Sequence, residues 1–231
     1  PIVVDIGGTK MRVAAVRNGK LDEIEIIDTP GHPTEGINAL ISLARHAAGV
    51  DDVAELVGDI SGVVKEGIII KSPNLPQWNR TDISTRLKSE FGVPAILFND
   101  AELVALGEYH HGIGYHSDAM AYITVSTGVG GALIVDGKID HDGVYNYEIG
   151  HQLVRGKELE DQVSGTAIKE KYGVEPKEFC NPEVLHELAE ILAEGLYNTV
   201  LAWSPDTIVL GGSMITGANS IPVKHVEETL D

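Results

Sequence analysis

The sequence of 231 residues is poor in cysteine, in basic residues and in long apolar runs. Its single cysteine, Cys180, excludes an internal disulfide and a metal site built from several thiolates. Only 17 residues are Lys or Arg against 35 Asp or Glu, and the net charge of −18 argues against nucleic acid or an anionic membrane as the main partner. No apolar run reaches the roughly 18 residues of a membrane-spanning helix, and no signal peptide is recognised. With 43% hydrophobic residues the chain can bury a sizeable core, and we expect a soluble, cytoplasmic α/β protein.

Two parts of the sequence follow the same order of apolar strand, glycine turn, second strand and hairpin. In the first part the turn is Gly7-Gly8-Thr9, and Asn18-Gly19 is a strong hairpin signal. In the second part the turn is 126–131 (STGVGG), and Asp136-Gly137 is the hairpin signal. The repeat predicts two similar lobes facing each other across a cleft.

We place the lobes at residues 1–112 and 113–231. The first 28 residues predict an antiparallel meander of three strands, followed by a helix that begins at Pro33. A long helix with an apolar stripe is predicted after Asn181-Pro182, because Asn can cap a helix and Pro suits its first position. The proline-rich stretch 72–78 predicts a loop without regular structure.

Both glycine turns directly follow a strand, where exposed backbone N–H groups can hold phosphate oxygens. Thr9 and Thr127 add hydroxyl groups to them. One such turn is explained equally well as a plain hairpin bend, and the matching pair favours phosphate binding. Asp5 closes the strand before the first turn, where its carboxylate would suit Mg²⁺ directly or through water; a hydrogen-bonding Asp at a strand end is an equal alternative.

Asn99 and Asp100 stand where the apolar stretch 95–98 meets a predicted helix. An Asp there can cap the helix, or it can act as the general base that takes the proton from a sugar hydroxyl. An ordinary Asp, with a pKa of about 3.9, is ionised at neutral pH and can accept that proton. General-base help contributes roughly 10²–10⁴-fold to a rate.

Glu148, His151 and Glu160 offer acceptors and a donor for several hydroxyl groups. A polyol is recognised by such groups, because each buried polar atom left unpaired costs about 1–3 kcal/mol. Zinc binding by His151 lacks cysteine partners, and a packed or surface role for this histidine stays open.

Seven motifs in order resemble the ROK family of sugar kinases, within the actin/hexokinase/Hsp70 ATPase superfamily. They are DIGGTK at 5–10, SPNLPQW at 72–78, FNDA at 98–101 with ALGE at 105–108, STGVGG at 126–131, EIGH at 148–151, LE at 159–160 with VSG at 163–165, and VLGGS at 209–213. The resemblance implies an α/β, two-lobed, actin-like ATPase fold (ribonuclease H-like), in which each lobe is a mixed sheet flanked by helices and the active site lies in the interlobe cleft.

The resemblance also implies transfer of the γ-phosphoryl group of ATP to a hexose, expected to be glucose at its 6-hydroxyl, with Mg²⁺ and with Asp100 as the base. It assigns the sugar to Asn74, Asn99, Asp100, Glu148, His151 and Glu160. It assigns ATP to Asp5, Gly7, Gly8, Thr9, Lys10, Thr127, Gly128, Gly211 and Gly212, with Mg²⁺ at Asp5 through water. A homodimer is the assembly that it implies.

The sequence departs from the family pattern in two places. Many members carry a structural zinc in a cysteine-rich insert after the E-x-G-H motif, whereas residues 152–158 are short and contain no cysteine. We therefore expect no zinc, which leaves His151 without a metal to position it. Members also continue past the adenosine motif to a last helix that returns to the first lobe; the printed sequence stops at Asp231, and we expect that helix to be missing from it.

Two alternatives to a glucokinase stay open. One is a kinase for fructose, mannose or an N-acetylhexosamine. The other is a non-catalytic sugar-binding sensor of the same family. ROK repressors carry a DNA-binding segment before this domain and often lose the catalytic apparatus, whereas here the first phosphate motif lies within the first ten residues and Asp100 is present.

Overall fold

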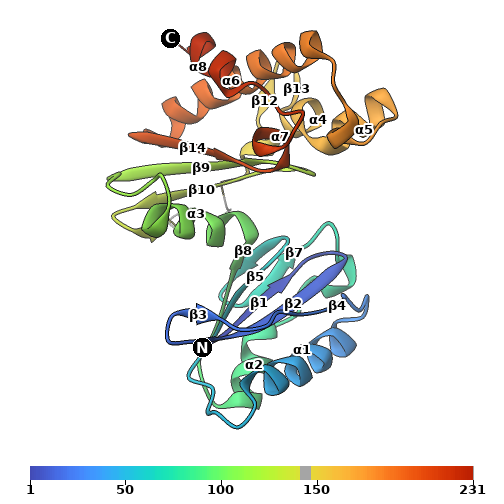
Figure 1. The fold of residues 1–231 in the computed structure, drawn as a ribbon, viewed down its shortest axis with the longest axis vertical. Coiled ribbons are helices and arrows are strands. Elements are labelled where there is room, and N and C mark those ends of the chain that lie inside the picture. The colour runs from blue at the N-terminus through green and yellow to red at the C-terminus, as the bar shows by residue number, and fades with distance from the viewer. Residues whose placement is uncertain (141–146, 231) are drawn as a thin grey trace. The chain divides into compact units, whose positions relative to one another are not determined.

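The computed structural model describes residues 1–140 and 147–230, and the chain divides into two compact units, Pro1–Leu103 and Val104–Asp231 (Figure 1). Each unit has a sheet and a hydrophobic core of its own. The division falls a few residues before the sequence-based boundary between residues 112 and 113, which stays a prediction.

Unit 1 is a mixed sheet with helices packed on it. Its elements are β1 (Ile2–Ile6), β2 (Lys10–Arg17), β3 (Lys20–Leu21), β4 (Glu25–Asp28), α1 (Pro33–Ala48), β5 (Leu56–Ile60), β6 (Val63–Lys65), β7 (Ile68–Lys71), the 3₁₀ turn η1 (Pro76–Trp78), α2 (Ile83–Phe91) and β8 (Ala95–Asn99). The sheet order is β3-β2-β1-β5-β8, with β4 also paired to β2. Where the sequence predicted one third strand of the meander, the structure has two short strands, β3 and β4, and both pair with β2. The stretch 72–78 contains one 3₁₀ turn, which the prediction of no regular structure missed.

Alternation along the strands of unit 1 sorts side chains to the two faces of its sheet. Ile2, Val4 and Ile6 of β1 are buried in the core, where the apolar side of α1 also packs. Asp5 lies on the other face, because successive strand residues point to opposite sides. The polar residues of interest in unit 1 therefore lie away from its core.

Unit 2 repeats this plan with a smaller sheet. Its elements are the remainder of α3 (Asp100–His111), β9 (Ala119–Val125), β10 (Val129–Val135), β11 (Lys138–Ile139), η2 (Ile149–His151), β12 (Leu153–Val154), β13 (Lys157–Glu158), α4 (Glu160–Val163), α5 (Gly165–Tyr172), η3 (Pro176–Glu178), α6 (Pro182–Trp203), β14 (Thr207–Gly211), α7 (Ser213–Thr216) and α8 (Val223–Leu230). The sheet order is β11-β10-β9-β14. Asn181 caps α6 by accepting hydrogen bonds from Glu183 N and Val184 N, as its sequence predicts.

The strand pairing confirms the internal repeat. In unit 1, β1 pairs antiparallel with β2 and parallel with β5; in unit 2, β9 pairs antiparallel with β10 and parallel with β14. Both predicted hairpins have two successive residues at positive φ, 51° and 73° at Asn18-Gly19 and 50° and 76° at Asp136-Gly137. This conformation defines the tight turn that matches strand twist.

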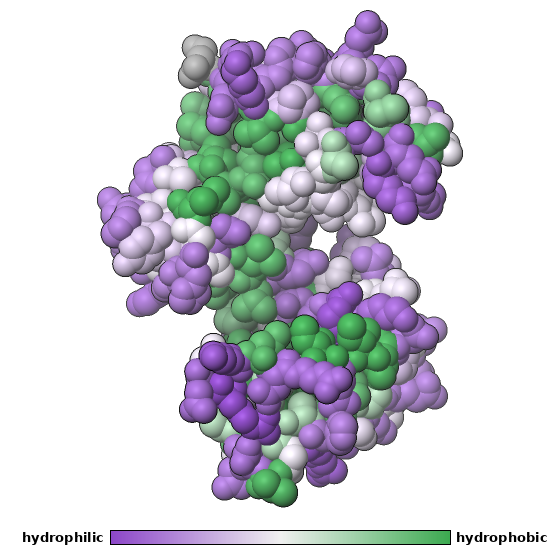
Figure 2. All heavy atoms as spheres, viewed as in Figure 1, coloured by the Kyte–Doolittle hydropathy of each residue, from purple (hydrophilic) through white to green (hydrophobic). Residues whose placement is uncertain are grey.

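Charged and polar side chains cover much of the face drawn in Figure 2, as the acidic composition leads one to expect. Among the helices of the described residues, none combines the length and the apolar character needed to cross a membrane.

Candidate functional site

The carboxyl ends of three parallel strands carry polar residues of unit 1, and Asp5, Asn99 and Asp100 among them were predicted from the sequence. Asp5 lies near the end of β1, Asp59 near the end of β5, and Asn99-Asp100 at the end of β8. Because β1, β5 and β8 run parallel, these ends share one edge of the sheet. Ligands of open α/β sheets bind at this edge.

Strand register sets Asp5 and Asp59 side by side on one face of the sheet. Asp5 is opposite Asp59 in the parallel pair and opposite Arg12 in the antiparallel pair. Arg12 Nη1 lies 2.5 Å from Asp5 Oδ2, so one positive charge faces the two carboxylates. Asp59 was not singled out from the sequence, because its place beside Asp5 follows only from the pairing of β1 with β5.

The pKa values of Asp59 and Asp100 are both raised by their surroundings. Burial is the main cause at Asp59, followed by the charges of Asp5 and Asp100, and together they raise its pKa to about 7 despite Arg12. Desolvation also raises the pKa of Asp100, against hydrogen bonds from the backbone that lower it. A raised pKa makes the ionised carboxylate of Asp100 a stronger base.

Asp100 begins α3 and serves as part of its cap. Asp100 Oδ1 and Asn99 Oδ1 both accept the backbone N–H of Ala101, each at 2.9 Å. The structure shows the capping contact of Asp100, and its role as a general base stays a prediction.

Two asparagines assigned to the sugar are held by the turn after β5. Asn74 Nδ2 donates to Ser61 Oγ at 3.2 Å, and Asn99 Nδ2 donates to the carbonyl of Gly62 at 2.8 Å. Gly62 has a φ of 145°, and a Cβ there would lie 2.5 Å from Lys71 O. Ser61 was not singled out from the sequence, since a serine beside a glycine gives no signal of its own.

The first glycine turn is close to Asn74. A Cβ on Gly8 would lie 2.4 Å from Asn74 Cβ, so only glycine fits beside the sugar-side loop. Thr29 Oγ1 donates to Gly7 O at 2.7 Å and fixes the turn from outside. Lys10, assigned to ATP, instead pairs with Asp28 through Nζ and Oδ1 at 2.5 Å.

In unit 2 the second glycine turn and the adenosine motif meet at one sheet edge. The parallel strands β9 and β14 end at Val125 and Gly211, and Gly212 follows with a φ of 92°. A Cβ on Gly212 would lie 2.3 Å from Val125 O, immediately before the turn that contains Thr127 and Gly128. The structure therefore brings the predicted cofactor residues of this unit together.

Glu160 and α5 hold the second turn in place. Glu160 Oε2 accepts the N–H of Val129 at 2.6 Å, and a Cβ on Gly128 would lie 2.4 Å from the same oxygen. Thr166, at the start of α5, donates its hydroxyl and its N–H to Thr127 O at 2.7 and 3.2 Å. Thr166 was not singled out from the sequence, because the contact joins segments 39 residues apart.

The E-x-G-H segment adjoins the same turn. A Cβ on Gly150 would lie 2.4 Å from Val129 O and 3.3 Å from Glu160 Cβ. His151 Nδ1 lies 2.7 Å from Glu158 Oε2. The hydrogen bond to Glu158 raises the pKa of His151, burial opposes it, and the charges of Glu148 and Glu160 raise it further. Glu158 thus positions His151, for which the sequence analysis expected no metal ligand partner.

The residues present fit Mg²⁺ held through water and a nucleotide held by backbone. The described residues contain no group of three or more His, Cys, Asp or Glu able to enclose a metal. Asp5 offers one carboxylate beside a glycine turn, which suits Mg²⁺ because this ion keeps several waters. A Cβ on Gly8, Gly128 or Gly212 would lie too close to a neighbouring atom, so these positions carry no side chain. The backbone therefore forms the surface of each turn.

Residues 1–230 match the ROK family. The chain belongs to the ROK family. A glucokinase of Pyrobaculum calidifontis is 29% identical over 91% of this chain and 78% of its own. A fructokinase of Zymomonas mobilis is 32% identical over 65% of this chain, and the match spans only 56% of that relative.

Among solved structures, the ROK hexokinase of Thermus thermophilus has a TM-score of 0.81 and 27% identity, and the match covers 99% of this chain and 86% of that one. The chain therefore has the α/β, two-lobed, actin-like ATPase fold that its motifs implied. The interlobe position of the active site stays a prediction.

Proposed function

We propose that the chain transfers the γ-phosphoryl group of ATP to a hexose, with glucose at its 6-hydroxyl as the favoured acceptor. The observation that carries this proposal is Asp100, a carboxylate with a raised pKa at the carboxyl edge of a parallel sheet, beside Asp5 and Asp59. Membership of a family with a glucokinase and a fructokinase among its members supports a sugar as the acceptor.

In this proposal Asp100 accepts the proton of the attacking hydroxyl while that oxygen forms its bond to the γ-phosphorus. The bond between this phosphorus and the bridging oxygen of ADP breaks, and ADP leaves with the electron pair. Asn74 and Asn99, held by the turn after β5, orient the sugar. Glu148, His151 and Glu160 contribute the remaining hydroxyl contacts.

On the nucleotide side, Gly7, Gly8 and Thr9 hold phosphate in unit 1, and Thr127 and Gly128 do so in unit 2. Gly211 and Gly212 face adenosine. Mg²⁺, held through water at Asp5, would neutralise charge on the transferred group. We assign Lys10 to the same phosphates, which requires it to leave Asp28; both side chains are exposed, and such a pair is worth only about 0–1 kcal/mol.

A coupled assay of ADP formation across glucose, fructose, mannose and N-acetylmannosamine, with ATP and Mg²⁺, tests the proposal. We expect turnover with one or more hexoses, glucose highest. Tight hexose binding by calorimetry without any ADP formation would instead assign the chain to sensors. Light scattering on the same sample tests the homodimer that belongs to the proposal.

A further inference from the structure

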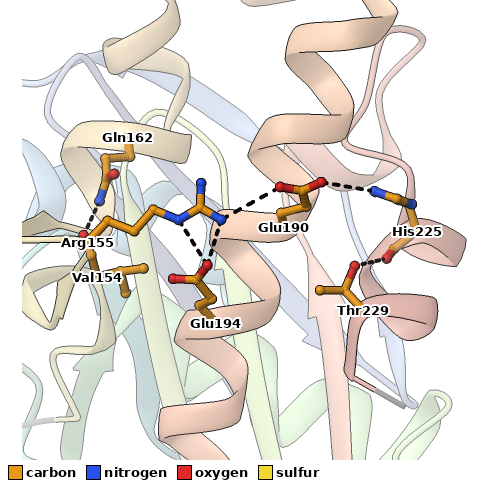
Figure 3. Close-up of polar contacts among 7 residues, drawn as sticks. All are labelled: Val154, Arg155, Gln162, Glu190, Glu194, His225 and Thr229. Atoms are coloured by element: carbon orange, nitrogen blue, oxygen red, sulfur yellow. Dashed lines mark hydrogen bonds and ion pairs between the residues drawn. The ribbon is translucent and has the colours of Figure 1, made fainter.

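The β12–β13 hairpin is fastened on both sides within unit 2. Its turn residues Arg155 and Gly156 have φ values of 52° and 80°, the geometry of a tight hairpin. Arg155 donates to Glu194 of α6 through Nε at 2.9 Å and Nη2 at 2.6 Å, and it also faces Glu190 (Figure 3). The short hairpin is therefore tied to the longest helix of the unit.

The far side of the hairpin is tied to α4. Gln162 Nε2 donates to the carbonyl oxygens of Val154 at 2.9 Å and Glu158 at 3.1 Å, and Figure 3 shows the first of these contacts. Val154 and Leu159, the residue directly after Glu158, are buried in the core. Glu158, the last residue of β13, is thus held by strand pairing, by Gln162 and by a core residue beside it.

The side chain of Glu158, whose backbone is held in this way, contacts His151, which the E-x-G-H motif assigns to the sugar. Glu158 Oε2 lies 2.7 Å from His151 Nδ1, so the imidazole donates its Nδ1 proton to Glu158. Nε2 is then the nitrogen left for a ligand. The other carboxylates that act on the ring are Glu148 and Glu160, whose negative charges also raise its pKa.

We propose that Glu158 is a positioning residue for hexose binding, which fixes the ring orientation of His151 and presents Nε2 to a sugar hydroxyl. The proposal rests on the proposed function, because His151 has a sugar to bind only if the chain takes one. The charge of Glu158 also favours the imidazolium form, which would make Nε2 a hydrogen-bond donor. A neutral ring would make Nε2 an acceptor, so the carboxylate sets what His151 offers.

The test is Glu158→Gln, an exchange that keeps shape and removes charge. Imidazole NMR of the whole protein over a pH series measures the His151 pKa and tautomer without any ligand, and glucose calorimetry with steady-state kinetics measures binding. We expect the His151 pKa to fall. We expect the glucose Kd and KM to rise about 3- to 10-fold with kcat little changed, as for one lost hydrogen bond.

Glu25→Gln is the matched control, since Glu25 Oε1 makes the same kind of contact with His46 Nδ1, at 2.8 Å, in unit 1, far along the chain from the E-x-G-H segment. It should leave His151 and glucose binding unchanged. An unaltered His151 titration in Glu158→Gln, or an altered titration with an unaltered glucose Kd, overturns the proposal. If the wild-type protein binds no hexose, the proposed function fails, and sugar positioning fails with it; the titration still shows whether Glu158 controls the ring.

Discussion

Asp59 gives the clearest expectation at the scale of single residues. Burial, then the charges of Asp5 and Asp100, raise its pKa in the folded protein to about 7. A carboxyl group whose pKa rises on folding stabilises the fold while it is protonated. That contribution is complete below pH about 4 and is lost as the pH rises through 7.

Asp59→Asn removes this ionisation and keeps the side-chain shape. We expect the variant to have a higher free energy of unfolding than wild type at pH 8, by roughly 1–3 kcal/mol, because solvent screens part of the full linkage value. The difference should shrink at pH 5. Urea unfolding at both pH values measures it, with Asp52→Asn at an exposed position as control. A difference that is the same at both pH values would refute the account.

Residues that belong to a motif could be singled out from the sequence. Residues whose role comes from a contact with another segment could not. Asn99, Asp100 and Glu160 were singled out because each ends a strand or begins a helix, and Asp5 because it precedes a glycine turn; their roles stay predictions. Asp59, Ser61, Glu158 and Thr166 gain meaning only from what lies across the sheet or the loop. The partner of Asp59 lies on another strand, and those of Ser61 and Thr166 are 13 and 39 residues away, so no local spacing could indicate these three residues. Glu158 is only seven residues from His151, but no motif connected the two.

At the scale of elements, hairpin turns fix the register of each sheet. Gly19 has a φ of 73°, and a Cβ there would meet nothing within 4 Å. Gly19→Ala should therefore cost about 1–2 kcal/mol of unfolding free energy through backbone strain alone. Gly31→Ala, which also has open space but no positive φ, is the matched control for urea unfolding. Equal stability of the two variants would show that this turn carries no strain.

Periodicity predicted most helices and strands, since apolar spacing determines which side is buried. The third strand of the meander was wrong as one element, because residues 22–24 interrupt the pairing and leave β3 and β4. The strand β6 and the hairpin β12–β13 were not expected: they are too short for alternation to show.

At the scale of the whole molecule, each unit has its own core. A substitution that disrupts the core of one unit should therefore leave the stability of the other unchanged. A Cβ on Gly58 would lie 2.0 Å from Val4 O, between the central strands of unit 1. Gly58→Ala should speed amide hydrogen exchange in peptides of residues 1–103 and leave those of 119–140 and 147–230 near wild type. Faster exchange spread evenly over both units would contradict this separation of cores. Gly107→Ala, with open space in a helix, is the control.

The central claim is that Asp100 is the base of a hexose kinase, and Asp100→Asn tests it most directly. The amide keeps the contact with Ala101 N but accepts a proton poorly. We predict that kcat for ADP formation with the best hexose falls about 10²–10⁴-fold, while the hexose Kd by calorimetry stays near wild type and Asp136→Asn, in an exposed hairpin, stays fully active. A kcat equal to wild type in Asp100→Asn would contradict the account.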